Sequence, residues 1–463
     1  MHRRRVALWF LAVLALIPGV AMAHEVGGTR FDSPLPLPLL FAGAGATVAI
    51  TALWLGWSEP TPDEAWTHRL GVIPGEMARV GRFVAVAVFT VAVLGAIITG
   101  ALGPQATAEN FATVFVWGVW FKGLGLVAML VGTPWLLLSP WRNVYQLLSR
   151  LEGEQLSMTE FSDRFGVWPA VAGFVLVIGL AENLIGVPRS PPLTVGVVVT
   201  FALLMIAGGI AFGPVWFRRG DAFAVLYRLF GRVAPIDVKR TAAGGYRLES
   251  RPPWRGCTKP LDHPGAVTFI VAVVYTVSFD GFTSTPEYQT VLFTTRDALG
   301  TGLTTALFLY AAGLTLFVAS FLIVAALADV AGSRDNEARS GATSAARAFA
   351  PTVIPIAAAY EFAHYYPSVV RSVGRTLELT IAAAGIFVDI SLLGWLGLPI
   401  FWGSQVLLIV GGHIVAVVAA HGVAHNRYRT PPNARRGHLP LVVLMIGYTV
   451  LSLWIVSRPV VTG

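Results

Sequence analysis

Apolar segments long enough to cross a lipid bilayer recur along the 463-residue chain. A helix needs about 20 apolar residues to span the hydrocarbon core, because each residue advances it by about 1.5 Å. Windows that meet this requirement lie at 36–57, 81–103, 112–138, 168–186, 193–215, 265–283, 300–328, 350–367, 401–425 and 440–457. Charged residues make up only 13% of the chain, too few to cover a soluble surface of this size. The sequence therefore predicts an all-α polytopic bundle of about ten spans, and excludes a soluble enzyme, a disordered chain and a DNA-binding domain.

The first 23 residues have the parts of a secretory signal peptide: three arginines, an apolar stretch from Val6 to Val20, and the cleavage pattern Ala21-Met22-Ala23. We expect cleavage to leave a single transmembrane domain, 24–463, that begins with His24 outside the plasma membrane. A terminal amine and an imidazole can chelate one metal ion together, and copper favours such nitrogen donors. The alternative is that His24 merely follows the cleavage site.

The connecting loops carry an uneven positive charge that predicts the orientation of the spans. With the mature N-terminus outside, the inner loops hold 22 lysines and arginines and the outer segments six. Residues 377–400 are apolar enough to cross, but a crossing would move the basic segment 426–439 outside. We therefore predict that 368–400 is an outer loop with interfacial or re-entrant helices.

The longest inner loop, 216–264, holds ten lysines and arginines. We expect it to lie on anionic lipid headgroups rather than to bind nucleic acid. Cys257 is the single cysteine of the chain, which excludes internal disulfides and sites built from several cysteines.

Four ionisable residues fall inside the predicted spans: Glu182, Asp280, His364 and His413. The helical rise places them about 9–18 Å below the outer surface, in or near the outer half of the bilayer. Ionisable groups at such depths are costly and are often functional. For each residue the alternative is a structural role, as a hydrogen-bonded core residue or at a helix end. Their shared depth favours a common site.

Other ionisable residues form two further candidate groups. Lys122 and Glu361 both fall about 15 Å deep, so we predict a buried ion pair between them. Glu361 and His364 also have the i, i+3 spacing that places two ligands on one helix face. His421 and His425 are four residues apart at the inner end of a span, which is compatible with an inner metal site or with interfacial anchoring.

Four short motifs, in order along the chain, resemble a prokaryotic membrane-protein family known as fenitrothion hydrolase. They are residues 23–46 (AHEVGGTRFDSPLPLPLLFAGAGA), Phe279-Asp280-Gly281-Phe282, Ala363-His364-Tyr365, and Gly412-His413 with the later His421. The resemblance implies a polytopic fold and, by the family's name, organophosphate hydrolysis. Site positions that it implies are His24, Asp280, His364, His413 and His421. Lys122 and Glu361 are not part of it.

Two functions follow as hypotheses. In the first, the protein handles or transports a transition metal, copper or zinc, which His24 captures and which Asp280, His364 and His413 hold in the outer half of the membrane. Permeation would need a second site, for which His421 and His425 are the candidates. In the alternative, the same residues hold the metal of a membrane-embedded hydrolase that activates a bound water, with Asp280 or Glu182 as ligand or general base.

Overall fold

The computed structural model describes residues 37–57, 67–302, 304–333, 341–428 and 430–458. The longer helices are α2 (Leu37–Trp57), α3 (Gly75–Leu102), α7 (Pro140–Glu152), α9 (Pro191–Phe212), α12 (Pro264–Thr283), α13 (Pro286–Leu299), α14 (Thr304–Gly332), α16 (Ile354–Ala382), α17 (Leu398–Arg427) and α18 (Pro431–Val456). Shorter helices are α4 (Phe111–Thr113), α5 (Leu124–Val131), α6 (Trp135–Leu138), α8 (Trp168–Phe174), α10 (Trp216–Arg219), α11 (Ala222–Phe230) and α15 (Ala342–Phe349). Two π-helical segments, η3 (Val114–Gly123) and η4 (Val175–Glu182), continue α4 and α8.

The prediction of a helical membrane bundle is confirmed in its coarse form. Eight helices of the described residues are long and apolar enough to cross a membrane, and they coincide with eight of the ten predicted windows. The window 168–186 corresponds to a shorter apolar helix, Trp168–Glu182. The window 350–367 lies in α16, which is long but is interrupted by charged residues. These two helices carry Glu182, Glu361 and His364.

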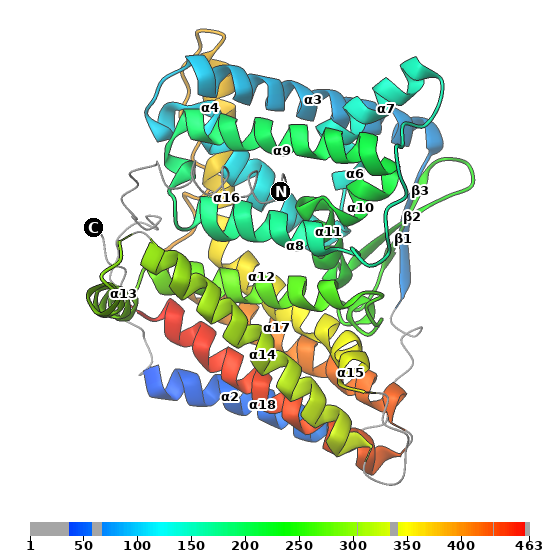
Figure 1. The fold of residues 1–463 in the computed structure, drawn as a ribbon, viewed down its shortest axis with the longest axis vertical. Helices are drawn as coiled ribbons and strands as arrows, with labels where there is room; N and C mark the ends of the chain where they lie inside the picture. The colour runs from blue at the N-terminus through cyan, green and yellow to red at the C-terminus, as the bar shows by residue number, and fades with distance from the viewer. Residues whose placement is uncertain (1–36, 58–66, 303, 334–340, 429, 459–463) are drawn as a thin grey trace, which may run out of the picture.

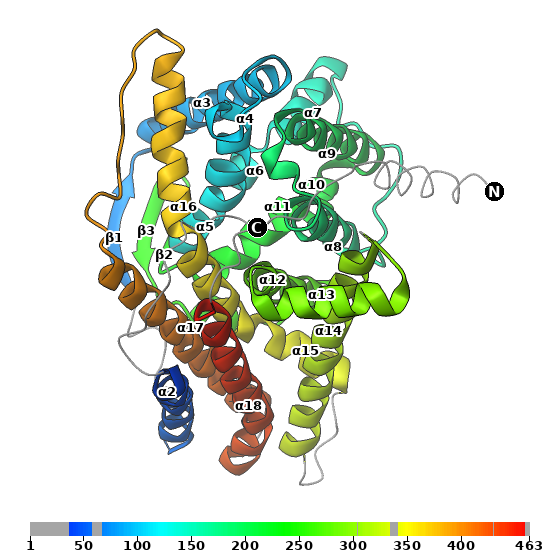
Figure 2. The same ribbon diagram turned by 90° about the vertical axis from the view of Figure 1, so that its left-hand side faces the viewer.

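The helices form two groups that α16 joins. In Figure 1, α3 and α9 lie in the upper half and α14, α18 and α2 in the lower half, with α8 and α12 between them. Figure 2 shows α16 running from the lower half to the top of the molecule. It packs against α17 and α12 in the lower half and against η3 in the upper half. The candidate site residues described below lie along this junction.

The segment 368–400 differs from the prediction of interfacial or re-entrant helices. Helix α16 continues past Pro367 to Ala382, and residues 383–397 then return without a helix to the start of α17 (Figure 2). The carboxylate of Glu378 holds the returning chain by accepting a hydrogen bond of 2.8 Å from the backbone N–H of Ile390. A helix of 29 residues thus takes up part of the stretch that apolarity alone assigned to separate short helices.

The basic segment 216–264 is folded rather than an open loop. It contains α10 and α11, and it supplies two strands of a three-stranded antiparallel sheet ordered β1-β3-β2. The strands are β1 (His68–Ile73), β2 (Ile236–Arg240) and β3 (Tyr246–Ser250). The sequence analysis missed this sheet, because its strands are short and polar. Both segments that form it were predicted to be inner loops, so their pairing agrees with that topology. Contact with anionic lipid headgroups stays a prediction.

Cysteine labelling tests the predicted outer position of the returning chain. Asp389 is exposed and is the site for a single cysteine, Asp389→Cys. The native Cys257 should not react with the label, because it is fully buried. Burial also raises the pKa of its thiol to about 12, and only the thiolate form is reactive. We expect an impermeant maleimide to label Asp389→Cys from outside intact cells and to leave the wild type unlabelled. Labelling only from the inner side would contradict the topology.

Candidate functional site

A buried ion pair joins the two π-helical segments. The Nζ atom of Lys122, next to the end of η3, lies 2.9 Å from Oε1 of Glu182, the last residue of η4. The side chains are only 12% and 3% exposed. Removing two charges from water is costly, and their attraction offsets that cost only at close range. This pair therefore fixes the positions of η3 and η4 relative to each other.

The structure corrects the predicted partner of Lys122. Sequence depth suggested Glu361, whereas the ammonium group of Lys122 pairs with Glu182. Depth is a single coordinate and does not tell which side chains at one level face each other. Glu361 nevertheless lines the same cavity as Lys122 and Glu182, and its Oε2 atom is buried without a hydrogen-bond partner.

Asp280 and His364 lie together, as their shared depth suggested. The Nε2 atom of His364 is 3.3 Å from Oδ2 of Asp280, and the hydroxyl of Tyr365 donates a hydrogen bond of 2.5 Å to the same oxygen. The Nζ atom of Lys122 lies 4.0 Å from the centre of the Tyr365 ring, within range of a cation–π interaction. Tyr365 thus contacts both charged groups, Asp280 through its hydroxyl and Lys122 through its ring. Sequence analysis missed it, although it follows His364 directly.

Close packing of glycines brings the π-helical segments to their neighbours. A Cβ atom on Gly118 in η3 would meet the side chain of Ser372 in α16, and one on Gly179 in η4 would meet the hydroxyl of Tyr310 in α14.

π-helical segments are rare and occur frequently at functional sites. Their widened turn alters the register of the side chains that follow. Lys122 and Glu182 stand at the ends of two such segments, which is where that register change takes effect.

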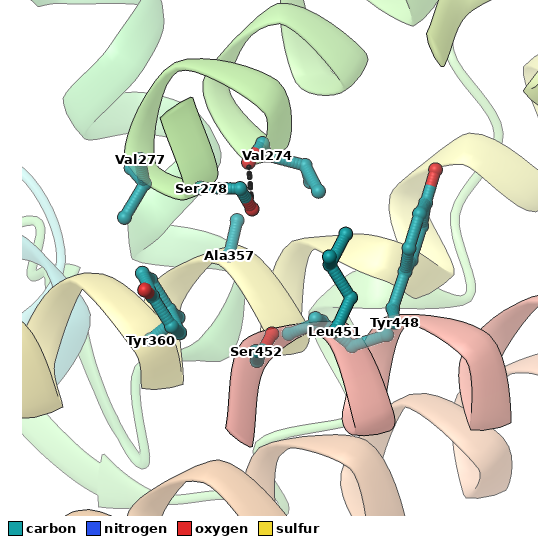
Figure 3. A pocket seen from close by; sticks show the side chains of 9 residues that line it. Val274, Val277, Ser278, Ala357, Tyr360, Tyr448, Leu451 and Ser452 are labelled. Carbon is teal, nitrogen blue, oxygen red and sulfur yellow. Dashed lines mark hydrogen bonds between the residues drawn. The ribbon is translucent and has the colours of Figure 1, made fainter. Parts of the chain in front are cut away.

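The ion pair borders a cavity of about 30 Å³, room for one or two water molecules. Its polar lining comes from Lys122, Glu182, Asn183, Thr276, Glu361 and Tyr365. A second cavity, of about 10 Å³, lies between α12, α16 and α18 (Figure 3). There the Tyr360 hydroxyl is buried without a hydrogen-bond partner, and its ring is stacked on that of His364 with centroids 6.0 Å apart. Val277 of α12 lines both cavities.

The metal centre predicted at His24, Asp280, His364 and His413 stays a prediction. In the part of the chain that the structure describes, no three or more His, Cys, Asp or Glu side chains form a group that could hold a metal ion. The Nδ1 atom of His413 lies 2.8 Å from the carbonyl oxygen of Ile409, while its Nε2 atom is buried without a partner. The Nε2 atom is therefore the ring nitrogen of His413 that has no hydrogen-bond partner in this structure. His24 lies outside the described residues.

His421 and His425 are neighbours at one end of α17, with ring centroids 4.4 Å apart. The ring of His438 lies 5.6 Å from that of His421. His438 lies within α18, because this helix begins at Pro431 rather than at the start of its apolar stretch. Beside them, Arg427 forms an ion pair of 2.9 Å with Asp329. An inner metal site at these histidines stays a prediction.

Comparison with known proteins gives no relative from which a role could be transferred. The chain matches no protein-family model, no curated protein and no solved structure. The resemblance to the fenitrothion hydrolase family stays a prediction, as do the copper or zinc cofactor and both functions inferred from it.

Proposed function

We propose that the protein is a membrane protein that transports a cation or a proton, and that the charged residues at the junction along α16 are its ion site. The observation that carries this proposal is an excess of carboxyl groups in the interior of the helical bundle. Glu182, Asp280 and Glu361 are gathered there with Lys122 and His364. Chains of acidic residues and histidines inside membrane proteins commonly form ion pathways and proton relays.

The charges of this group do not balance without an added cation or proton. Lys122 neutralises Glu182, and Asp280 is in contact with His364 and Tyr365. Glu361 forms no ion pair within the described residues, although its Oε2 atom is buried. An unpaired carboxylate in such surroundings costs several kcal/mol, so the group takes up a positive charge. This balance supports the proposal of a site that binds a cation or a proton.

The size of the cavity favours an ion over an organic substrate. Sites for organic ligands usually enclose about 300–1,000 Å³, whereas the cavity beside Lys122 measures about 30 Å³. An organophosphate would not fit there without a large rearrangement, but a water molecule, a proton or a small cation would. The proposal therefore departs from the hydrolase hypothesis and keeps a cation as the transported or coupling species.

Vesicles that contain the purified protein test this function. We expect one of three imposed gradients, of protons, of Na⁺ or of Cu⁺, to be dissipated faster in these vesicles than in protein-free vesicles of the same lipid. The copper gradient also tests the metal-handling hypothesis from the sequence. Equal rates with and without protein for all three cations, at either sign of the membrane potential, would contradict the proposal.

A further inference from the structure

Two carboxyl groups compete for one ammonium group in the larger cavity. Lys122, Glu182 and Glu361 all line it, from η3, η4 and α16 respectively. In this structure the ammonium is 2.9 Å from Glu182, and Oε2 of Glu361 has no hydrogen-bond partner. One cation cannot neutralise both carboxylates, so one of them needs a proton.

The surroundings of Glu361 identify which carboxyl group carries that proton here. Among the described residues, the charged groups that act on Glu361 are Lys122, Glu182 and Asp280. The hydroxyls of Tyr227, Tyr360 and Tyr365 are also close enough to Glu361 to interact with it electrostatically. Tyr227 donates to the carbonyl of Phe121 and Tyr365 donates to Asp280, so neither hydroxyl is directed to Glu361 in this structure. A neutral Glu361 avoids a third carboxylate charge in this group.

We propose that the ion transported through the site is a proton, and that Lys122 exchanges partners between Glu182 and Glu361 as this proton moves. This inference rests on the proposed transport function. When Glu361 releases its proton to a water molecule in the cavity, the new carboxylate attracts the ammonium of Lys122. Glu182 then loses its partner and takes up a proton. One O–H bond breaks at Glu361 and one forms at Glu182, while Lys122 stays charged.

The geometry provides a path for this exchange. Tyr365 lies one helical turn after Glu361 on α16, so the two side chains share a face. The ammonium of Lys122 already lies 4.0 Å from the ring centre of Tyr365. The aromatic face stabilises the cation while it is between carboxylates. The pair predicted from depth, Lys122 with Glu361, is then the second state of the site.

A proton fits this site better than a metal cation does. The cavity already contains the ammonium of Lys122, which repels a second cation at short range. The described residues also lack a group of three or more His, Cys, Asp or Glu ligands that could hold a metal ion. A proton needs no coordination shell and binds directly to a carboxylate oxygen.

Infrared spectroscopy of the purified protein at neutral pH tests the exchange, because a protonated carboxyl group gives a C=O stretching band separate from that of a carboxylate. We expect the wild type to show such a band from the interior. Glu361→Gln should lose it, because Lys122 neutralises Glu182. Glu182→Gln should also lose it, because Lys122 then pairs with Glu361. Lys122→Gln should instead gain intensity, because both carboxyl groups keep a proton.

Each outcome decides the proposal. A band that persists in Glu182→Gln would show that Lys122 does not move to Glu361, and a band that persists in Glu361→Gln would show that Glu361 is not the carrier. If Glu182→Gln does not fold, Lys122→Gln still tests the proposal. An intensity that does not increase in Lys122→Gln would contradict the proposed number of protonated carboxyl groups. The exposed Glu152→Gln is the control and should match the wild type. Spectra as expected without cation flux in vesicles would refute the transport function alone, whereas flux with an unchanged band in Glu182→Gln would refute the exchange alone.

Discussion

Replacing Lys122 with methionine should destabilise the protein by about 3–5 kcal/mol at neutral pH, because its buried partner loses the counter-charge and must take up a proton far above the ordinary pKa of a carboxyl group. That partner is Glu182, whose side chain is 3% exposed. The double variant Lys122→Met/Glu182→Leu should recover much of the loss, since it removes both charges. Unfolding in detergent, followed by tryptophan fluorescence, measures both effects. The cost of the single variant should shrink at low pH, where a protonated Glu182 needs no partner.

The matched control removes the pair that was predicted from depth in the membrane, Lys122 with Glu361, instead of the pair seen in the structure. Lys122→Met/Glu361→Leu leaves Glu182 without a cation, so it should recover little of the stability lost in Lys122→Met. Equal recovery by the two double variants would contradict the pairing seen in the structure. A single variant as stable as the wild type would show that water reaches the pair freely.

Replacing Asp221 with alanine should cost at least about 3 kcal/mol, because hydrogen bonds to a charged acceptor contribute about 1.5–3 kcal/mol each. Asp221 is 1% exposed and caps α11. Its carboxylate accepts from the indoles of Trp135 and Trp141 at 3.0 and 2.8 Å, and from the backbone N–H groups of Phe223 and Ala224 at 2.9 and 3.1 Å. Four buried donors lose their acceptor together.

Thermal unfolding with near-UV circular dichroism measures this loss and reports on the tryptophans directly. Asp221→Asn keeps one acceptor oxygen and should be intermediate. Asp163→Ala is the control, because its side chain is 92% exposed and its ion pair with Arg219 is a surface contact of small value. Similar melting temperatures for Asp221→Ala and Asp163→Ala would contradict the assigned role.

Predicted depth grouped most of the residues of the site but did not give the contacts between them. Apolar windows and the helical rise placed Glu182, Asp280, Glu361 and His364 at similar levels, and all four lie at the junction along α16. Which of them face one another depends on rotation about each helix axis and on which helices are neighbours. The π-helical turns before Lys122 and Glu182 alter that rotation, and no short-range sequence signal predicts them.

The histidines show the same limit. His413 shares the approximate depth of the site, but its Nδ1 atom faces the carbonyl of Ile409 in its own helix. His438 was missed because α18 extends into the polar residues before its apolar stretch, and hydropathy alone places the helix start too late. The sheet was not predicted because its strands are short, and because β1 pairs with β3 from a distant segment of the chain.

The rate of cation flux through the Glu361→Gln variant tests the central claim most directly. Wild type, Glu361→Gln and the exposed control Glu152→Gln are reconstituted at equal amounts in vesicles with a trapped pH indicator, and a proton gradient is imposed. Because we propose that Glu361 is the carboxyl group that exchanges the proton, Glu361→Gln should fall to the rate of protein-free vesicles, while Glu152→Gln keeps the wild-type rate. Wild-type flux through a folded Glu361→Gln protein would contradict the account.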